Sequence, residues 1–289
     1  MTLDANALQS ALAELVGAHL VRTDEAALLS HSHDYWLLDM QRRMHGVRPD
    51  ALPSAVVQPA SHDDVVKLVR FAAANSLALV PFGLGSGVCG GARPVAGAIV
   101  LDMSALNRIV SLNETALTVT VQAGMRGGEF ERQLNERGYS MGHFPQSLHL
   151  SSVGGWVATR ASGQFSSKYG SIEDMVVSLK AVLPDATTVS TRDVPRSSTG
   201  PDVRNLLIGS EGTLAVITEV TYKIHPTPAA QRGHAYMFPE FHQGLEAIRL
   251  ITREGWKPAL LRLYDRSEAK RHFGNAANGG CILLVLSEG

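Results

Sequence analysis

Residues 81–91 are Pro81-Phe82-Gly83-Leu84-Gly85-Ser86-Gly87-Val88-Cys89-Gly90-Gly91, and the apolar run Leu77-Ala78-Leu79-Val80 precedes them. The apolar run is typical of a buried strand. The glycines after it lack a Cβ, so the backbone can reach positive φ and close on a ligand. Successive N–H groups in such a loop can form an anion-binding nest. This first block therefore predicts a loop that holds a phosphate or pyrophosphate, and a glycine-rich turn without a ligand is the alternative.

The first block also contains the spacing of a Rossmann fingerprint, Gly85-x-Gly87-x-x-Gly90. That fingerprint requires a helix directly after the glycines, so that the pyrophosphate lies on the helix N-terminus. Here Pro94 and Gly97 follow, which disfavour a helix. The next segment, 98–102, is again apolar and predicts a strand that ends at Asp102. A strand–loop–strand order excludes the Rossmann fold.

Composition favours a globular protein with a sizeable core, because 45% of the 289 residues are hydrophobic and 18% are charged. A formal net charge of −1 gives no basic footprint, so no nucleic-acid partner is expected. Cys89 and Cys281 have no metal-site spacing, and the histidines between 31 and 48 are expected to serve packing and surface roles, so no metal is predicted. The N-terminal residues do not resemble a signal peptide, and we expect a cytoplasmic protein.

Hydrophobic periodicity predicts a helix over 5–20, a second over 24–30, and a β-α-β unit of neighbouring parallel strands from 55 to 82. Ser61 and Asp64 form a capping-box pattern at the start of the helix in that unit. Residues 127–138 predict a polar surface helix. The remaining predicted elements are strands at 98–102, 108–112, 116–122, 175–183, 187–190, 234–238, 259–264 and 282–286, and a helix at 240–254. The strands at 175–183 and 187–190 are expected to form a hairpin through the Pro184-Asp185 turn.

Two further blocks are rich in small residues and hydroxyl groups. The second block, 146–163, contains Ser151-Ser152-Val153-Gly154-Gly155-Trp156 and has only one full charge, Arg160. Small residues allow a large planar ligand to approach, and hydroxyl and N–H groups give it polar contacts. A tightly packed helix flanked by loops is an equal alternative for this block. The third block, 209–218, is a glycine-containing turn before an apolar strand, and it too would bring backbone against a ligand.

The three blocks, in this order, resemble the FAD-binding domain of the vanillyl-alcohol oxidase and p-cresol methylhydroxylase family, the PCMH type. Within that family the closest likeness is to alkyl-dihydroxyacetone-phosphate synthases, and it is carried by residues 152–163, by Ser198-Thr199-Gly200-Pro201-Asp202 and by 209–218. The resemblance implies an α+β fold. It places an N-terminal helical segment at 1–50, a two-subdomain FAD-binding domain at 51–228, and the start of an α/β cap (substrate) domain at 229–289.

The resemblance implies FAD as the cofactor, with the first block on its pyrophosphate. The FAD is expected to be non-covalent, because Ser86 stands near the place where covalent members carry a histidine; Cys89 is the nearest thiol. Leu84 replaces a glycine that is usual in such loops, so the nest is expected to be shifted or tighter. The cofactor-binding residues implied are Pro81, Phe82, Gly83, Leu84, Gly85, Ser86, Gly87, Gln146, Ser147, Leu148, His149, Leu150, Ser151, Ser152, Gly154, Gly155, Thr159, Arg160, Ala161, Ser162, Glu211, Gly212, Thr213, Leu214, Ala215, Val216 and Ile217.

The resemblance also implies a function, the exchange of an acyl for an alkyl group on acyl-dihydroxyacetone phosphate, an ether-lipid type of chemistry at the flavin N5. Arg262, in Arg262-Leu263-Tyr264-Asp265, would bind the substrate phosphate through its guanidinium; an ion pair with Asp265 is the alternative. An FAD-linked hydroxyacid dehydrogenase or oxidase, and a non-catalytic flavin-binding fragment, are the other functions considered, because the chain ends inside the expected cap and no catalytic residue is assigned. The expected partners are a small or lipid-derived substrate, a membrane surface contacted peripherally, and a second copy of the chain.

Overall fold

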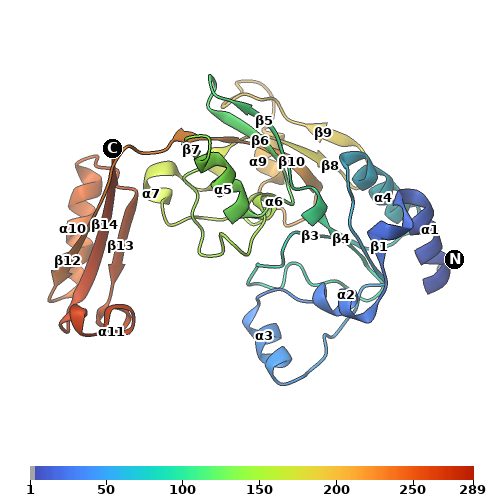
Figure 1. Ribbon diagram of the computed structural model, residues 1–289, viewed down its shortest axis with the longest axis horizontal. Helices are drawn as coiled ribbons and strands as arrows, with labels where there is room; N and C mark the ends of the chain where they lie inside the picture. The colour runs from blue at the N-terminus through green and yellow to red at the C-terminus, as the bar shows by residue number, and fades with distance from the viewer. Residues whose placement is uncertain (1–3) are drawn as a thin grey trace.

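The computed structural model describes residues 4–289, and it has the mixed α+β architecture that the sequence predicts. Figure 1 shows two sheets and their helices to the right and centre, with a third sheet set apart beside the C-terminus. Every helix within the described range is too short or too polar to traverse a lipid bilayer.

A four-stranded sheet carries the first block. Its strands are β1 (Val21–Arg22), β2 (Ala55–Val57), β4 (Ile99–Asp102) and β3 (Leu79–Phe82), in that order, with β2 and β3 both parallel to β4. The prediction that the 55–57 and 77–82 strands are neighbours is wrong, because β4 lies between them. The three residues 99–101 of β4 are fully buried and apolar, which is the pattern of a central parallel strand covered on both faces.

Four N-terminal helices accompany this sheet: α1 (Ala5–Val16), α2 (Glu25–Ser30), α3 (Leu37–Met44) and α4 (His62–Ala74). The helix predicted over 5–20 ends earlier, because Gly17 adopts φ +103°. Ser61 caps α4 as predicted, its Oγ accepting from the Asp64 N–H at 3.1 Å. The return bond of a capping box differs, since Asp64 accepts from the Ala60 N–H at 3.2 Å instead.

A five-stranded antiparallel sheet carries the third block. Its order is β5 (Ile109–Asn113), β6 (Thr118–Gln122), β10 (Val216–Lys223), β8 (Val176–Val182) and β9 (Thr188–Ser190), and the β8–β9 hairpin agrees with the prediction. Helices α5 (Gly127–Asn135) and α6 (Val153–Ala158) pack on it. The expectation that 127–138 is a surface helix with few apolar contacts is wrong, because Phe130 and Leu134 are fully buried in the core.

Short elements connect these layers. They are the 3₁₀ turns Ala18–Leu20, Met103–Ala105 and Gly274–Ala277, the helices α7 (Ser166–Tyr169), α8 (Ile172–Met175) and α9 (Val203–Leu207), and the two-stranded pair β7 (Tyr139–Ser140) and β11 (His225–Pro226).

The C-terminal sheet has the antiparallel order β12 (Gln231–Phe238), β14 (Cys281–Glu288) and β13 (Leu260–Tyr264), with α10 (Phe241–Arg253) and α11 (Arg266–Phe273). It is fastened to α7, where Lys168 and Tyr169 both donate to the Glu288 carboxylate, at 3.1 and 2.5 Å. The domain boundaries at 50 and 228 remain predictions.

Candidate functional site

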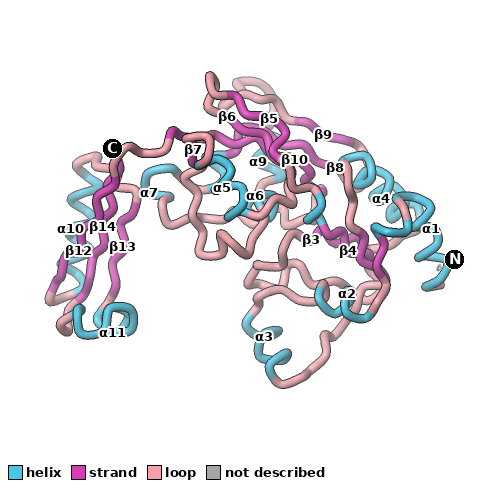
Figure 2. The backbone as a smooth tube through the Cα atoms, in the orientation of Figure 1, coloured by secondary structure: helices cyan, strands magenta, loops and turns pink. Residues whose placement is uncertain are grey.

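The three blocks meet around one cavity of about 680 Å³. Such a volume suits a cofactor or other small-molecule ligand. Figure 2 shows that the segments after β3 and before α6, which both contribute lining residues, are loops. The predicted residues that line the cavity are Pro81, Phe82, Gly83, Leu84, Gly85, Ser86, Gly87, Gln146, Ser147, Ser151, Ser152, Gly154, Gly155, Thr159, Ala161, Ser162, Glu211, Gly212, Ala215 and Ile217.

The first block leaves its backbone N–H groups available. Within residues 4–289, no N–H from 83 to 92 donates a hydrogen bond to the protein. Gly85 adopts φ +63°, a left-handed conformation that favours glycine. A Cβ at Gly85 would lie only 2.6 Å from the Phe82 ring. A loop of unpaired amides that excludes side chains is suited to an anionic group such as a pyrophosphate.

The second block touches the first through α6. Ser152 caps this helix, its Oγ accepting from the Gly155 N–H at 3.3 Å. The same Oγ occupies the place that a Cβ on Gly83 would need. Further along, a Cβ on Gly154 would lie 2.5 Å from the Ala123 Cβ. Small residues in this block therefore serve helix packing and also line the cavity, and their contact with a ligand stays a prediction.

The third block docks on the other two. The Gly209 and Glu211 N–H groups donate to the carbonyls of Val157 and Ala158, at 2.9 and 3.0 Å. A Cβ on Gly212, whose φ is +78°, would lie 3.0 Å from Pro81. Glu211 itself adopts φ +48°, which is unusual for a residue with a side chain. The turn is thus held by backbone hydrogen bonds to the second block, and its Gly212 lies close to the Pro81 ring of the first block.

Several predicted residues lie outside the cavity wall. Leu148 packs against the core of the five-stranded sheet, and the His149 ring lies against Gly128. Arg160 donates through Nε to the Ile208 carbonyl at 3.2 Å, so it braces the third block instead of facing the cavity. The full set outside the wall is Leu148, His149, Leu150, Arg160, Thr213, Leu214 and Val216; of these, Leu150 and Leu214 are exposed and Val216 is buried in the core.

The cavity also has lining residues outside the three blocks, including Asp34, Met103, Ala123 and Pro145. Met103 and Ala123 follow strands β4 and β6 directly, so the ends of the predicted strands could have indicated them as lining residues. No sequence feature indicated Asp34, because the histidines around it were expected to serve packing and surface roles. It reaches the cavity through a long-range contact, in which the Tyr35 N–H donates to the Gly87 carbonyl at 2.8 Å.

Beside the cavity, His143 is buried with an exposed fraction of 1%, and neither ring nitrogen has a hydrogen-bond partner among the described residues. Its ring meets the Trp156 ring edge-on, with centroids 4.7 Å apart. Burial lowers the pKa of the His143 imidazole to about 4. The imidazole is therefore neutral near pH 7.

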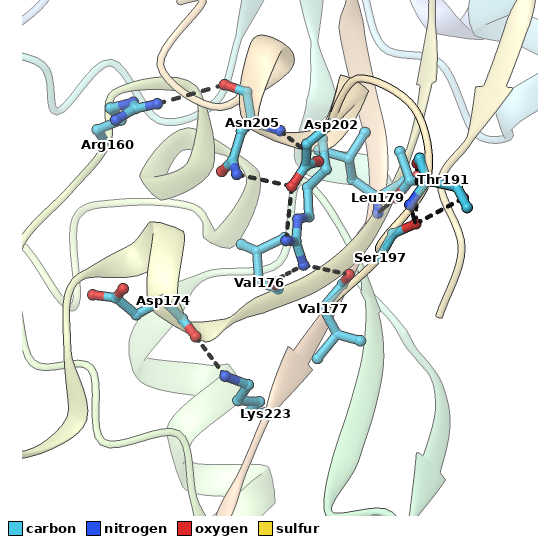
Figure 3. A network of polar contacts seen from close by, with 12 residues as sticks. Arg160, Asp174, Val176, Val177, Leu179, Thr191, Ser197, Asp202, Asn205 and Lys223 are labelled. Carbon is cyan, nitrogen blue, oxygen red and sulfur yellow. Dashed lines mark hydrogen bonds and ion pairs between the residues drawn. The ribbon is translucent and has the colours of Figure 1, made fainter. Parts of the chain in front are cut away.

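Asp202, the last residue of the motif at 198–202, has a structural role that Figure 3 shows. Asp202 caps α9, accepting from the Asn205 N–H at 3.2 Å. It also binds Arg204, whose guanidinium donates to the carbonyls of Val176 and Val177 at 3.0 and 2.9 Å. Arg204 thus ties α9 to β8, and α9 leads directly into the third block. In the same view, Lys223 donates separately to the Asp174 carbonyl.

Arg262 lies on β13, in the C-terminal sheet, and does not line the cavity. Its guanidinium lies over the Tyr264 ring, 4.9 Å from the centroid. Asp265 instead caps α11, accepting from the Glu268 N–H at 2.8 Å. Among the described residues there is no ion pair between Arg262 and Asp265, so that alternative for Arg262 is not supported.

These features fit FAD. Unpaired loop amides suit its pyrophosphate, and the glycines of the wall leave room for a ligand at the positions where they stand. A model of the FAD-binding domain family matches residues 53–192. The chain is 40% identical to the Uncharacterized FAD-linked oxidoreductase YgcU of Escherichia coli (strain K12) over 294 residues, which cover 100% of this chain and 60% of that protein.

Two synthases are also similar. Identity to the alkyldihydroxyacetonephosphate synthase of Caenorhabditis elegans is 39% over 244 residues, covering 83% of this chain and 41% of that protein. A solved alkyldihydroxyacetonephosphate synthase structure superposes with a TM-score of 0.85 at 31% identity, covering 94% of this chain and 53% of that one. The chain thus spans about half the length of these relatives. It contains an FAD-binding domain of the PCMH type and is homologous to the alkyldihydroxyacetonephosphate synthases and YgcU.

Proposed function

We propose that the cavity between the three blocks holds FAD without a covalent link. The observation that supports this most directly is the loop 83–92, whose amides donate no hydrogen bond to the described protein. No histidine lies in residues 81–91, and Ser86 cannot form the usual bond to the flavin ring. Purified protein should show a flavin spectrum, and acid precipitation should release all the flavin into the supernatant. Flavin retained in the pellet would contradict the non-covalent mode and would point to Cys89.

In this proposal each part of the wall has a separate task. The amides of the first block bind and orient the pyrophosphate, and the small residues of the second and third blocks exclude water from the flavin ring. Bound FAD would supply the reactive ring system, while the protein supplies orientation and electrostatics. Arg262 binds the phosphate of the substrate, since a guanidinium forms bidentate, charge-assisted bonds.

For the activity, we propose exchange of an acyl for an alkyl group on acylated dihydroxyacetone phosphate. The support is the similarity to synthases in sequence and, over 94% of the chain, in structure. An FAD-linked hydroxyacid dehydrogenase or oxidase is the second candidate, favoured by the 40% identity to an FAD-linked oxidoreductase along the whole chain. An acylated substrate would also bring the protein to a membrane surface.

The experiment is one protein preparation, loaded with FAD, assayed in two ways. In the first assay it receives acylated dihydroxyacetone phosphate with a fatty alcohol, and the released fatty acid is measured. In the second it receives a panel of 2-hydroxyacids with an artificial electron acceptor, and reduction of the acceptor is measured. Turnover in the first alone supports the exchange, and turnover in the second alone supports the dehydrogenase. Flavin binding without either activity would favour the non-catalytic fragment.

A further inference from the structure

Asp34 is a cavity-lining carboxylate that comes from outside the matched FAD-binding region, 53–192. It lies between α2 and α3, and its exposed fraction is only 1%. Buried carboxylates normally have partners that compensate their lost hydration. The surroundings of Asp34 therefore bear on what the cavity binds.

The segment that carries Asp34 is fixed against the first block. The Asp34 Oδ1 accepts from the Trp36 N–H at 2.8 Å, and the Tyr35 N–H donates to the Gly87 carbonyl at 2.8 Å. The Trp36 ring also packs close to Gly90, where a Cβ would lie 3.4 Å away. These contacts set the direction of the carboxylate, so its position is not that of a free surface side chain.

The second carboxylate oxygen, Oδ2, has no partner among the described residues. It lies under the first block, 3.5 Å from the position of a Cβ on Gly87. Buried polar atoms are almost always hydrogen-bonded, and a carboxylate oxygen requires a donor. A phosphate group would be repelled by Asp34. Within FAD, the partner that suits Oδ2 is therefore a neutral donor, and the hydroxyl groups of the ribityl chain and of the ribose are such donors.

We propose that Asp34 is a cofactor-binding residue whose Oδ2 accepts a hydrogen bond from a hydroxyl group of the ribityl chain or ribose of FAD. This inference rests on the proposed FAD binding. It predicts the direction in which removing the Asp34 charge changes the affinity for FAD, and an Asp34 that faced the phosphates would give the opposite direction. If Asp34 faced the phosphates, removing its charge would tighten FAD binding, whereas loss of an acceptor weakens it.

The test compares Asp34→Asn with wild type and with Asp50→Asn. The amide keeps an oxygen for the Trp36 N–H, so the fold is maintained. Asp50 is an exposed carboxylate in the same N-terminal region, paired with Arg42 and Arg93 outside the cavity wall, and it controls for loss of one charge. We expect FAD to dissociate at least about tenfold more readily from Asp34→Asn, by flavin fluorescence titration. Asp50→Asn should stay within about twofold of wild type.

Melting of the apo-proteins separates binding from a structural role. Without FAD, Asp34→Asn should melt at or above the wild-type temperature, because it removes an uncompensated buried charge. Addition of FAD should raise its melting temperature by less than it raises that of wild type. Unchanged or tighter FAD binding, or a lower apo melting temperature with normal binding, would overturn the inference. A wild type that binds no flavin would overturn the proposed function as well.

Two fragments of the cofactor identify the source of the hydroxyl. FMN carries the ribityl chain, and ADP carries the ribose. Weaker binding of FMN alone by Asp34→Asn assigns the ribityl chain, and weaker binding of ADP alone assigns the ribose. If both fragments bind the variant as they bind wild type, no hydroxyl of the cofactor contacts Asp34.

Discussion

The contact between the first and second blocks can be tested with Gly83 and Ser152. Gly83 does not have a positive φ, so alanine meets no backbone strain there. Its Cβ would nevertheless collide with the Ser152 Oγ, which caps α6. The hydroxyl would have to rotate away, and loss of an N-cap costs about 0.5–2 kcal/mol. Gly83→Ala should therefore destabilise the apo-protein by about 1–2 kcal/mol, cap loss and residual crowding together.

The expected cost of Gly83→Ala in unfolding free energy is different when residue 152 is already alanine. In Ser152→Ala the cap is already lost and the Oγ is absent, and the remaining Cβ would lie 3.5 Å from the new methyl group, an ordinary contact. Adding Gly83→Ala to Ser152→Ala should then cost nothing, or stabilise by up to about 1 kcal/mol through a less flexible unfolded chain. The coupling between the two positions should be about 1–2 kcal/mol or more.

The assay is urea unfolding of wild type, both single variants and the double variant without FAD, followed by FAD titration of each. The unfolding data give the coupling free energy, and the slopes with urea show whether the variants unfold in the same way. If Gly83→Ala costs the same unfolding free energy in both backgrounds, the first and second blocks are not in contact at this point.

Three further outcomes are expected. Gly85→Val should remove most FAD binding and also lower the melting temperature, because the new side chain meets the Phe82 ring at positive φ; full flavin occupancy would contradict the role of the loop. Arg262→Lys should weaken dihydroxyacetone phosphate binding by about 1–2 kcal/mol and Arg262→Ala by more, with the flavin spectrum unchanged; calorimetric titrations that give equal affinities would exclude this anchor. The buried His143 takes up its proton near pH 4 when folded and near 6.5 when unfolded, so folding stability should fall by about 3 kcal/mol as the pH drops from 6.5 to 4. Denaturation of wild type and His143→Phe at each pH measures this. If the unfolding free energy depends on pH equally in both proteins, the prediction is refuted.

Local sequence patterns were enough for most elements and for the three blocks. The Ser61 cap, the β8–β9 hairpin and the glycine loop after β3 all depend on residues close together in the chain. Such features follow from short-range chemistry, namely capping oxygens, alternation and glycine at turns. The position of β4 between β2 and β3 does not, because strand order depends on which strand can be covered on both faces.

Long-range contacts explain the remaining differences. The face of α5 that carries Phe130 is buried because Tyr222, on β10, lies against it. Arg160 belongs to a block that lines the cavity, yet its partner is the Ile208 carbonyl, 48 residues away. Asp34 reaches the cavity only because its neighbour Tyr35 bonds to Gly87. No local pattern in the sequence carries these pairings.

Glycine in this site has two distinct physical uses, and the sequence does not separate them. Gly85 adopts a positive φ within a loop of unpaired amides, so its missing side chain serves backbone conformation and access for a ligand. Gly154 has no positive φ, and its missing side chain lets α6 lie against Ala123. A substitution of the first kind should therefore affect flavin binding in addition to folding, whereas one of the second kind should act through the packing of α6. Because the cavity wall is itself made of closely packed backbone, glycine enrichment here indicates crowding between segments as much as contact with a cofactor.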